Sequence, residues 1–183
     1  MDFSRISQGE HKPTLVLMAG LSGAGKTALA LRLGAALQWP VLSKDTLRSS
    51  LLMMEIIERV AGFAAYEVLF ALVYDMLVKQ NISVIVDCST LYPFILHRSL
   101  ELTRMAGARL KVVHCMADSH VRSDRLMMRE TVTAPTFSKP ALLTKDEEHK
   151  LFAHLPHNTL VIHTVGPLEE YLPKVIAYVA CEH

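Results

Sequence analysis

With 183 residues, the chain is long enough for one substantial core and too short for two ordinary domains, so we expect residues 1–183 to form a single domain. Hydrophobic residues make up 51% and charged residues 20% of the sequence, with no uncharged apolar run of membrane-spanning length, which favours a soluble α/β protein. Nineteen basic and eighteen acidic residues leave a net charge of +1, unlike the strongly basic balance of proteins that grip long nucleic acid. We therefore expect no membrane partner, and nucleic acid only as a less favoured one.

The N-terminus, the cysteines and the histidines set further limits. Residues 1–5 contain no apolar segment of the kind that marks a secretory signal, so we expect an N-terminal tail over residues 1–12 and a cytoplasmic location. The three cysteines are odd in number and widely spaced, which predicts reduced thiols. His154 and His157 resemble a metal-ligand pair, but no cysteine or carboxylate cluster accompanies them, and we expect both at the surface.

The strongest motif follows the apolar run Thr14–Ala19, which predicts a buried strand. A glycine-rich turn comes next, and Lys26–Leu37 then has the composition and apolar spacing of a helix. The spacing G-x-x-x-x-G-K-[ST] is that of a P-loop, which binds phosphate. Its eight residues are Gly20, Leu21, Ser22, Gly23, Ala24, Gly25, Lys26 and Thr27.

The residue types in this loop suit a nucleotide and a magnesium ion. Glycines let successive backbone N–H groups turn towards one anion. Lys26 can reach the β- and γ-phosphates, the Thr27 hydroxyl can bind Mg²⁺, and the positive end of the helix dipole points at the same anion. We therefore predict ATP and Mg²⁺ as cofactors; the alternative is a strand-to-helix turn without a ligand.

Polar residues follow two further predicted strands. Val41–Ser43 is followed by Asp45 and Arg48, which the carboxyl edge of a parallel sheet would place near the γ-phosphate; the alternative is a helix N-cap with its i+3 partner. Ile82–Asp87 ends in a carboxylate that suits Mg²⁺. The loop after it carries Ser89 and Thr90.

The remaining pattern alternates strands with helices and predicts a parallel sheet covered on both faces. The predicted helices are Ala61–Gln80, Pro93–Met105 with Arg98, a helix from Asp118 or Ser119, Lys145–Leu155 and Leu168–Ala180, and the predicted strands are Ala108–Cys115 and Asn158–Val165.

One predicted helix carries three arginines at spacings of three and four. Arg122, Arg125 and Arg129 share a face and repel one another unless an anion lies against them, so we favour phosphate contact over a solvated basic face. The segment Thr131–Thr144 contains Pro135 and Pro140 and has no periodicity, which is typical of a lid or an acceptor-binding loop.

The P-loop, the segment Ser43–Arg48, the strand end Val84–Asp87 and the arginine helix together resemble the small P-loop kinases. The nearest likeness, from about Thr14 to Glu130, is to predicted ATP-dependent kinases grouped with polynucleotide 5′-hydroxyl kinases, zeta toxins and chloramphenicol phosphotransferase. The resemblance implies a three-layer P-loop NTPase fold whose five-stranded parallel sheet has the order 2-3-1-4-5. It also implies a lid over about residues 119–144.

The same resemblance implies a role for each candidate residue. Catalysis would involve Lys26, Asp45 as the base for the acceptor hydroxyl, Arg125 and Arg129. Arg122 and Arg125 would contact the nucleotide, and Thr27 and Asp87 would hold Mg²⁺. The acceptor would be bound by Asp45, Arg48, Ser89, Thr90 and Arg98.

The favoured hypothesis is transfer of the ATP γ-phosphoryl group to a hydroxyl of a small molecule. The loop Cys88–Tyr92 lacks the asparagine often found there in polynucleotide kinases, and the chain offers no basic stripe for a nucleic acid. The apolar run Leu51–Met54 either lines a partly hydrophobic acceptor site or belongs to the core. A polynucleotide 5′-hydroxyl kinase and an ATPase switch without an acceptor remain alternatives.

Overall fold

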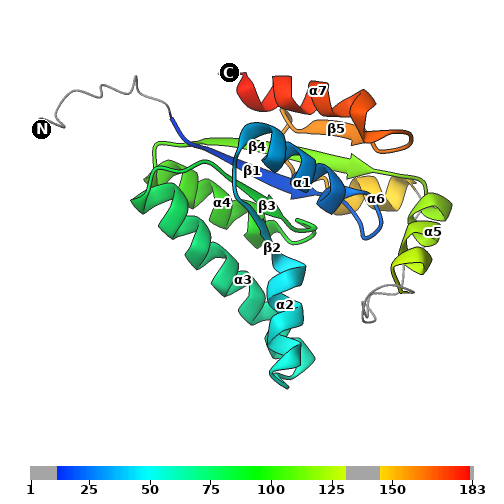
Figure 1. The fold of residues 1–183 in the computed structure, drawn as a ribbon, viewed down its shortest axis with the longest axis horizontal. Helices are drawn as coiled ribbons and strands as arrows, with labels where there is room; N and C mark the ends of the chain where they lie inside the picture. Colours follow the sequence, from blue (N-terminus) through cyan, green and yellow to red (C-terminus); the bar gives the residue numbers. More distant parts are fainter. Residues whose placement is uncertain (1–11, 131–144, 182–183) are drawn as a thin grey trace, which may run out of the picture.

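The computed structural model describes residues 12–130 and 145–181, in which a parallel sheet lies between two layers of helices (Figure 1). The five strands stand in the order β2-β3-β1-β4-β5, and every pairing is parallel. This confirms the three-layer fold and the strand order. The strands are β1 (Thr14–Ala19), β2 (Val41–Ser43), β3 (Val84–Asp87), β4 (Arg109–Met116) and β5 (Leu160–His163).

The helices cover both faces of the sheet (Figure 1). α1 (Lys26–Leu37) and α7 (Leu168–Ala180) lie on one face, and α3 (Glu58–Tyr74) and α4 (Pro93–Met105) on the other. α5 (Ser119–Glu130) and α6 (Lys145–Leu151) lie towards the edge to which the strands point, and α2 (Lys44–Met53) starts directly after β2. That edge is where a parallel α/β sheet places its ligand site.

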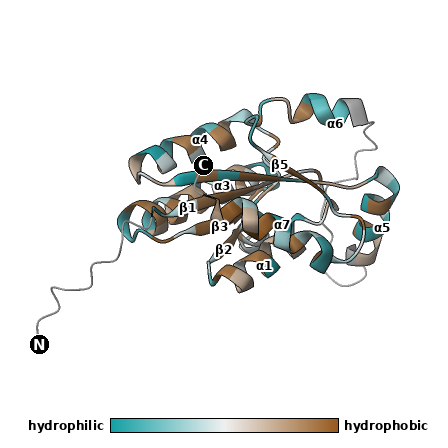
Figure 2. Cartoon of the chain, turned by 90° about the horizontal axis from the view of Figure 1, so that it is seen from above, coloured by the Kyte–Doolittle hydropathy of each residue, from teal (hydrophilic) through white to brown (hydrophobic). Residues whose placement is uncertain are grey.

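β1 is the centre of the sheet and is buried on both faces. Leu15 and Leu17 pack into the core under α3 and α4, whereas Val16 and Met18 pack into the core under α1 and α7. Successive strand residues point to opposite faces, so a strand between two helical layers must be apolar throughout. Figure 2 shows this hydrophobic character along β1.

The predicted helix Ala61–Gln80 is one regular helix only in part. The α-helix ends at Tyr74 and continues as the π-helical turn η1 (Asp75–Lys79), where the Asp75 carboxylate accepts a hydrogen bond from Gln80 and pairs with Lys79. By length and hydropathy the span Glu58–Lys79 could cross a membrane. Its inner face nevertheless packs into the core, as the apolar spacing predicts. The buried residues of that face are Tyr66, Leu69, Phe70, Val73 and Leu77.

Other predicted boundaries need small corrections. The third strand begins at Val84 rather than Ile82, because Ser83 accepts a hydrogen bond from the Thr14 backbone N–H at 2.9 Å and lies outside the ladder. α6 ends at Leu151 rather than Leu155, and β5 is shorter than Asn158–Val165 at both ends. The helix predicted from Asp118 or Ser119 is present as α5, and its role as a lid stays a prediction; the predicted lid loop over residues 131–144 lies outside the described residues.

Candidate nucleotide-binding site

The P-loop is pressed against neighbouring backbone at two of its glycines. Gly20, with φ of 129°, and Gly23, with φ of 81°, adopt conformations that L side chains rarely tolerate. A Cβ at Gly20 would lie 2.2 Å from the Cys115 carbonyl oxygen, and one at Gly23 would lie 2.6 Å from the Arg122 carbonyl oxygen. The loop therefore needs glycine here both for its shape and for its close packing.

Lys26 lies inside this loop. Its Nζ donates a hydrogen bond to the Leu21 carbonyl oxygen at 2.8 Å. Burial lowers the pKa of Lys26, and the nearby Asp87, Cys115 and Asp45 act in the opposite direction. A buried ammonium group gains most from a bound anion, which is what a phosphate would supply.

Thr27 and Asp87 meet beside the loop. The Thr27 Oγ1 donates a hydrogen bond to the Asp87 Oδ2 at 2.8 Å, because β3 runs next to β1 and ends level with the start of α1. Among the described residues, no group of three or more His, Cys, Asp and Glu side chains could hold a metal. A hydroxyl and one carboxylate suit Mg²⁺, which binds few protein oxygens when phosphates and waters complete its shell.

Arg125 fastens α5 to the P-loop. Its guanidinium donates to the Gly23 carbonyl oxygen at 3.3 Å and to the Thr164 hydroxyl and carbonyl oxygens at 3.2 and 2.6 Å. Arg122 is 2% exposed and donates from Nε to the Ala117 carbonyl oxygen. A solvated basic face is therefore wrong for Arg122, while the side chain of Arg129 lies outside the described residues.

Thr164 is a site residue that no sequence motif indicated. It is fully buried after β5, and its hydroxyl lies 2.9 Å from the Ala24 carbonyl oxygen and 3.3 Å from that of Met116. Together with Arg125, it joins the P-loop to the ends of β4 and β5. Only the strand order brings this residue to the loop, because 140 positions separate it from Ala24.

Asp45 and Arg48 lie on the other side of the P-loop, in α2. The Ser43 hydroxyl, rather than Asp45, accepts the capping hydrogen bond of this helix, from the Thr46 N–H. Asp45 pairs with Lys44 at 3.4 Å and keeps 75% of its side chain exposed, while Arg48 forms an ion pair with Glu58 of α3. The alternative of an Asp45 cap with Arg48 as its partner is therefore wrong.

The loop after β3 connects the two sides of the site. The Ser89 carbonyl oxygen accepts the Gly20 N–H at 3.1 Å, and the Ser89 side chain lies near the Tyr66 hydroxyl. Thr90 is fully buried and donates to the Met18 carbonyl oxygen at 2.6 Å, so its hydroxyl holds the loop. His154, expected at the surface, is half-buried and donates from Nε2 to the Thr90 carbonyl oxygen, whereas His157 is exposed as predicted.

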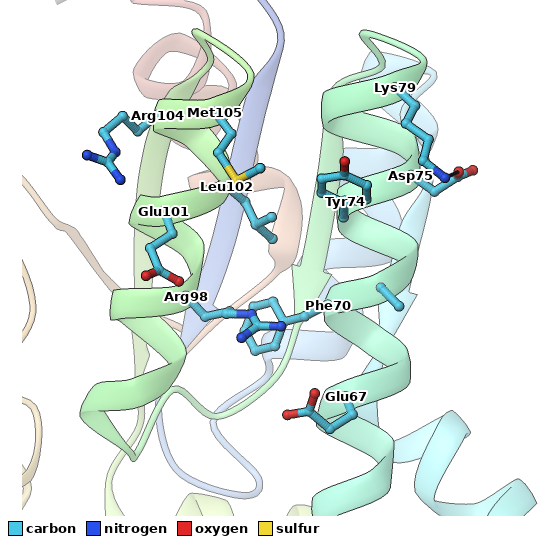
Figure 3. Close-up of a pocket in the computed structure, with 11 residues that line it drawn as sticks. Glu67, Phe70, Tyr74, Asp75, Lys79, Arg98, Glu101, Leu102, Arg104 and Met105 are labelled. Atoms are coloured by element: carbon cyan, nitrogen blue, oxygen red, sulfur yellow. Dashed lines mark ion pairs between the residues drawn. The ribbon is translucent and has the colours of Figure 1, made fainter.

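Arg98 is not brought together with the P-loop. It points from α4 into a groove of about 610 Å³ between α4 and α3, opposite Glu67 (Figure 3). Phe70, Tyr74 and Leu102 also line this groove. No P-loop residue is among its lining residues in the described part of the chain, so an acceptor contact by Arg98 stays a prediction.

His114 and Glu148 are buried ionisable groups that the sequence patterns did not single out. His114 is paired with Ala19 across the sheet and packs against the Phe152 ring with 4.4 Å between centroids. Burial lowers its pKa to about 4, and nearby Lys26 adds to the effect. Burial also raises the pKa of Glu148, against the attraction of Arg122. The protonation states of these two side chains near Lys26 therefore depend on burial and on the neighbouring charges.

The Leu51–Met54 run is not part of the core. Met53 and Met54 are 86% and 72% exposed, and Leu51 and Leu52 are only partly buried. The interpretation of this run as core is therefore wrong for the two methionines.

The sheet order and the glycine loop define a P-loop nucleotide-binding protein with the kinase-type fold. A family comparison then specifies the family: residues 15–144 match the AAA domain, and the chain belongs to that family. No curated protein matches the chain in sequence.

Several solved structures share the fold at low sequence identity. A presumed kinase from Chloroflexus aurantiacus is 19% identical with a TM-score of 0.68, over 91% of this chain and 98% of that one. The APS kinase of Mycobacterium tuberculosis, in complex with AMPPNP and APS, is 17% identical with a TM-score of 0.64, over 93% and 99%. A gluconokinase from Sinorhizobium meliloti is 18% identical with a TM-score of 0.56, over 92% of each chain. These likenesses show the fold.

Proposed function

We propose that this protein transfers the γ-phosphoryl group of ATP to a hydroxyl of a small molecule. The observation that carries the proposal is the contact between Thr27 and Asp87 beside Lys26, with the exposed Asp45 carboxylate just beyond the neighbouring strand. Relatives of the same fold that are named as an APS kinase and a gluconokinase support it.

The proposed chemistry needs charge and position more than covalent help from the protein. Lys26 and the backbone N–H groups of the P-loop would hold the β- and γ-phosphates. Thr27 and Asp87 would hold Mg²⁺, which supplies neutralisation of the phosphate charge. Arg125 already lies against the loop and could add a further positive charge at its Gly23 end.

Asp45 is the proposed base. The acceptor oxygen would form a bond to the γ-phosphorus while the bond to the ADP oxygen breaks, and the hydroxyl proton would pass to Asp45. The carboxylate is exposed at the start of α2, where it pairs with Lys44 at 3.4 Å. It is therefore accessible to an acceptor on the side opposite Arg125.

The test compares Asp45→Asn with Asp75→Asn, an identical change in η1, which follows the C-terminal end of α3. With γ-labelled ATP and a panel of alcohols, sugars, nucleosides and oligonucleotides, kcat for Asp45→Asn should fall by about a hundredfold or more with ATP affinity nearly unchanged. Asp75→Asn should keep the wild-type rate. If Asp45→Asn hydrolyses ATP at the wild-type rate, and neither protein labels any acceptor, the result would instead support an ATPase switch without an acceptor.

The same panel separates the two kinds of acceptor. Transfer to a 5′-hydroxyl oligonucleotide should weaken steeply with salt, because each neutralised phosphate adds about 0.9 to the slope of log K against log salt. Efficient transfer with such a slope would contradict the small-molecule proposal.

A further inference from the structure

Three aromatic rings form one cluster on the acceptor side of the P-loop. Tyr66 of α3 meets Phe94 of α4 edge to face, with 5.4 Å between centroids. Tyr92 stacks on Phe94 with 6.0 Å between centroids and 19° between the ring planes. Tyr66 is 7% exposed, whereas Tyr92 and Phe94 are 56% and 45% exposed. The cluster thus has a buried base and two open rings.

The cluster is joined to the groups around Asp45. The Lys44 ammonium lies 5.3 Å from the centroid of the Tyr66 ring and also pairs with the Asp45 carboxylate. The Tyr66 hydroxyl lies near the Ser89 side chain, two residues after Asp87. The open rings therefore follow the same loop that reaches the P-loop through Ser89.

We infer that the acceptor carries its hydroxyl near an aromatic or heteroaromatic ring, and that this ring stacks on Tyr92 or Phe94. The inference rests on the proposed function, because it names the acceptor class of that site. A ring added to an open stacked pair gains from the geometry that aromatic rings prefer, by about threefold to tenfold in affinity for each ring contact.

The cluster is built in a way that suits selection by stacking. Phe94 packs edge to face against the buried Tyr66 and stacks on Tyr92, and these contacts limit the movement of its ring before a ligand binds. Fixed rings lose little entropy on binding. The chain thus offers a preformed aromatic surface beside a carboxylate, while an aliphatic polyol would gain little from it.

The experiment uses benzyl alcohol and cyclohexylmethanol, which match in size and in the position of the hydroxyl but differ in aromaticity. Binding is measured by saturation-transfer NMR with the protein saturated with an unhydrolysable ATP analogue. Phosphoryl transfer is measured separately with γ-labelled ATP. In the wild type, benzyl alcohol should bind at least fivefold more tightly and should show the higher kcat/KM.

The variants Phe94→Leu and Tyr92→Leu should lose this preference and leave cyclohexylmethanol unchanged, while Tyr92→Phe should retain it. Circular dichroism checks that each variant is folded. Transfer to both alcohols at equal rates would overturn the aromatic subsite and leave the kinase proposal standing. A preference in binding that depends on Phe94, without transfer to any alcohol, would support the subsite and contradict the proposed chemistry.

Discussion

On the phosphate side of the site, the P-loop glycines touch the Cys115 and Arg122 backbone, and Lys26 has a short hydrogen bond within the loop. On the side that we propose for the acceptor, Asp45 is largely exposed and Phe94 about half exposed. The first side is part of the core of the sheet, whereas the second consists of surface positions attached to it. A change on the phosphate side should therefore affect folding and chemistry together, while a change on the acceptor side should affect the choice of substrate.

The sharpest way to test this contrast is to remove one lysine from each side. Lys26→Ala should lower phosphoryl transfer by about a thousandfold or more, because the transition state loses a buried positive charge. Lys44→Ala should change the acceptor kcat/KM by about tenfold or less. Steady-state kinetics with γ-labelled ATP measures both, and Lys174→Ala on the exposed side of α7 is the control. Equal losses for Lys26 and Lys44 would contradict the division.

Two glycines should respond to alanine in opposite directions. Gly23→Ala should lower the free energy of unfolding by about 3 kcal/mol, since φ is positive and the new Cβ would meet the Arg122 carbonyl oxygen. Gly62→Ala in α3 has open space around the new Cβ and should raise it by about 0.5 to 1 kcal/mol. Urea unfolding monitored by circular dichroism gives both values. A neutral Gly23→Ala would show that the loop can move away from α5.

The buried His114, on the phosphate side, should make the free energy of unfolding depend on pH. His114 has a pKa lowered to about 4 by burial, with Lys26, His149 and His163 nearby, so it stays neutral in the folded state while the unfolded chain binds a proton near pH 6.5. The free energy of unfolding should therefore fall by up to about 3 kcal/mol as the pH drops from 6.5 to 4. His114→Asn should remove this part of the slope, and the exposed His157→Asn should not.

The smallest expected effect concerns two buried hydroxyls. Thr164→Val should cost about 1 to 2 kcal/mol, because it removes the donor to the Ala24 carbonyl oxygen and a partner of Arg125. Thr14→Val should be neutral or stabilising, since the Thr14 hydroxyl has no hydrogen-bond partner among the described residues. Thermal unfolding of the two variants gives the difference in stability. Equal changes would show that the Thr164 hydroxyl does not stabilise the contact with the P-loop.

The parts of the molecule that local patterns specify were predicted well. The P-loop spacing, the helix Lys26–Leu37 and the buried strand Thr14–Ala19 depend on neighbouring residues and are found as expected. The strand order came from the family resemblance, because periodicity alone does not say which strands pair.

The site residues that the sequence patterns did not identify reach the site through the pairing of strands that are distant in sequence. Thr164 reaches the loop only because β5 lies beside β4, and His114 matters because its strand neighbours β1. The arginine pattern predicted phosphate contact, which stays a prediction; it did not predict that Arg125 also donates to the Gly23 and Thr164 carbonyl oxygens. The direction of Arg98 was also hidden, since the apolar spacing of α4 places Arg98 off the buried face but does not say which neighbouring helix it meets.

The distribution of thiols has a practical consequence for labelling. Cys88 and Cys115 are buried, and burial raises their pKa values to about 11 and about 12, so neither is a nucleophile at neutral pH. Cys181 is exposed directly after α7, whose C-terminal end lies away from the edge to which the strands point (Figure 1). A maleimide should therefore attach to the natural protein at this one cysteine and immobilise it with the nucleotide-binding edge facing the solution.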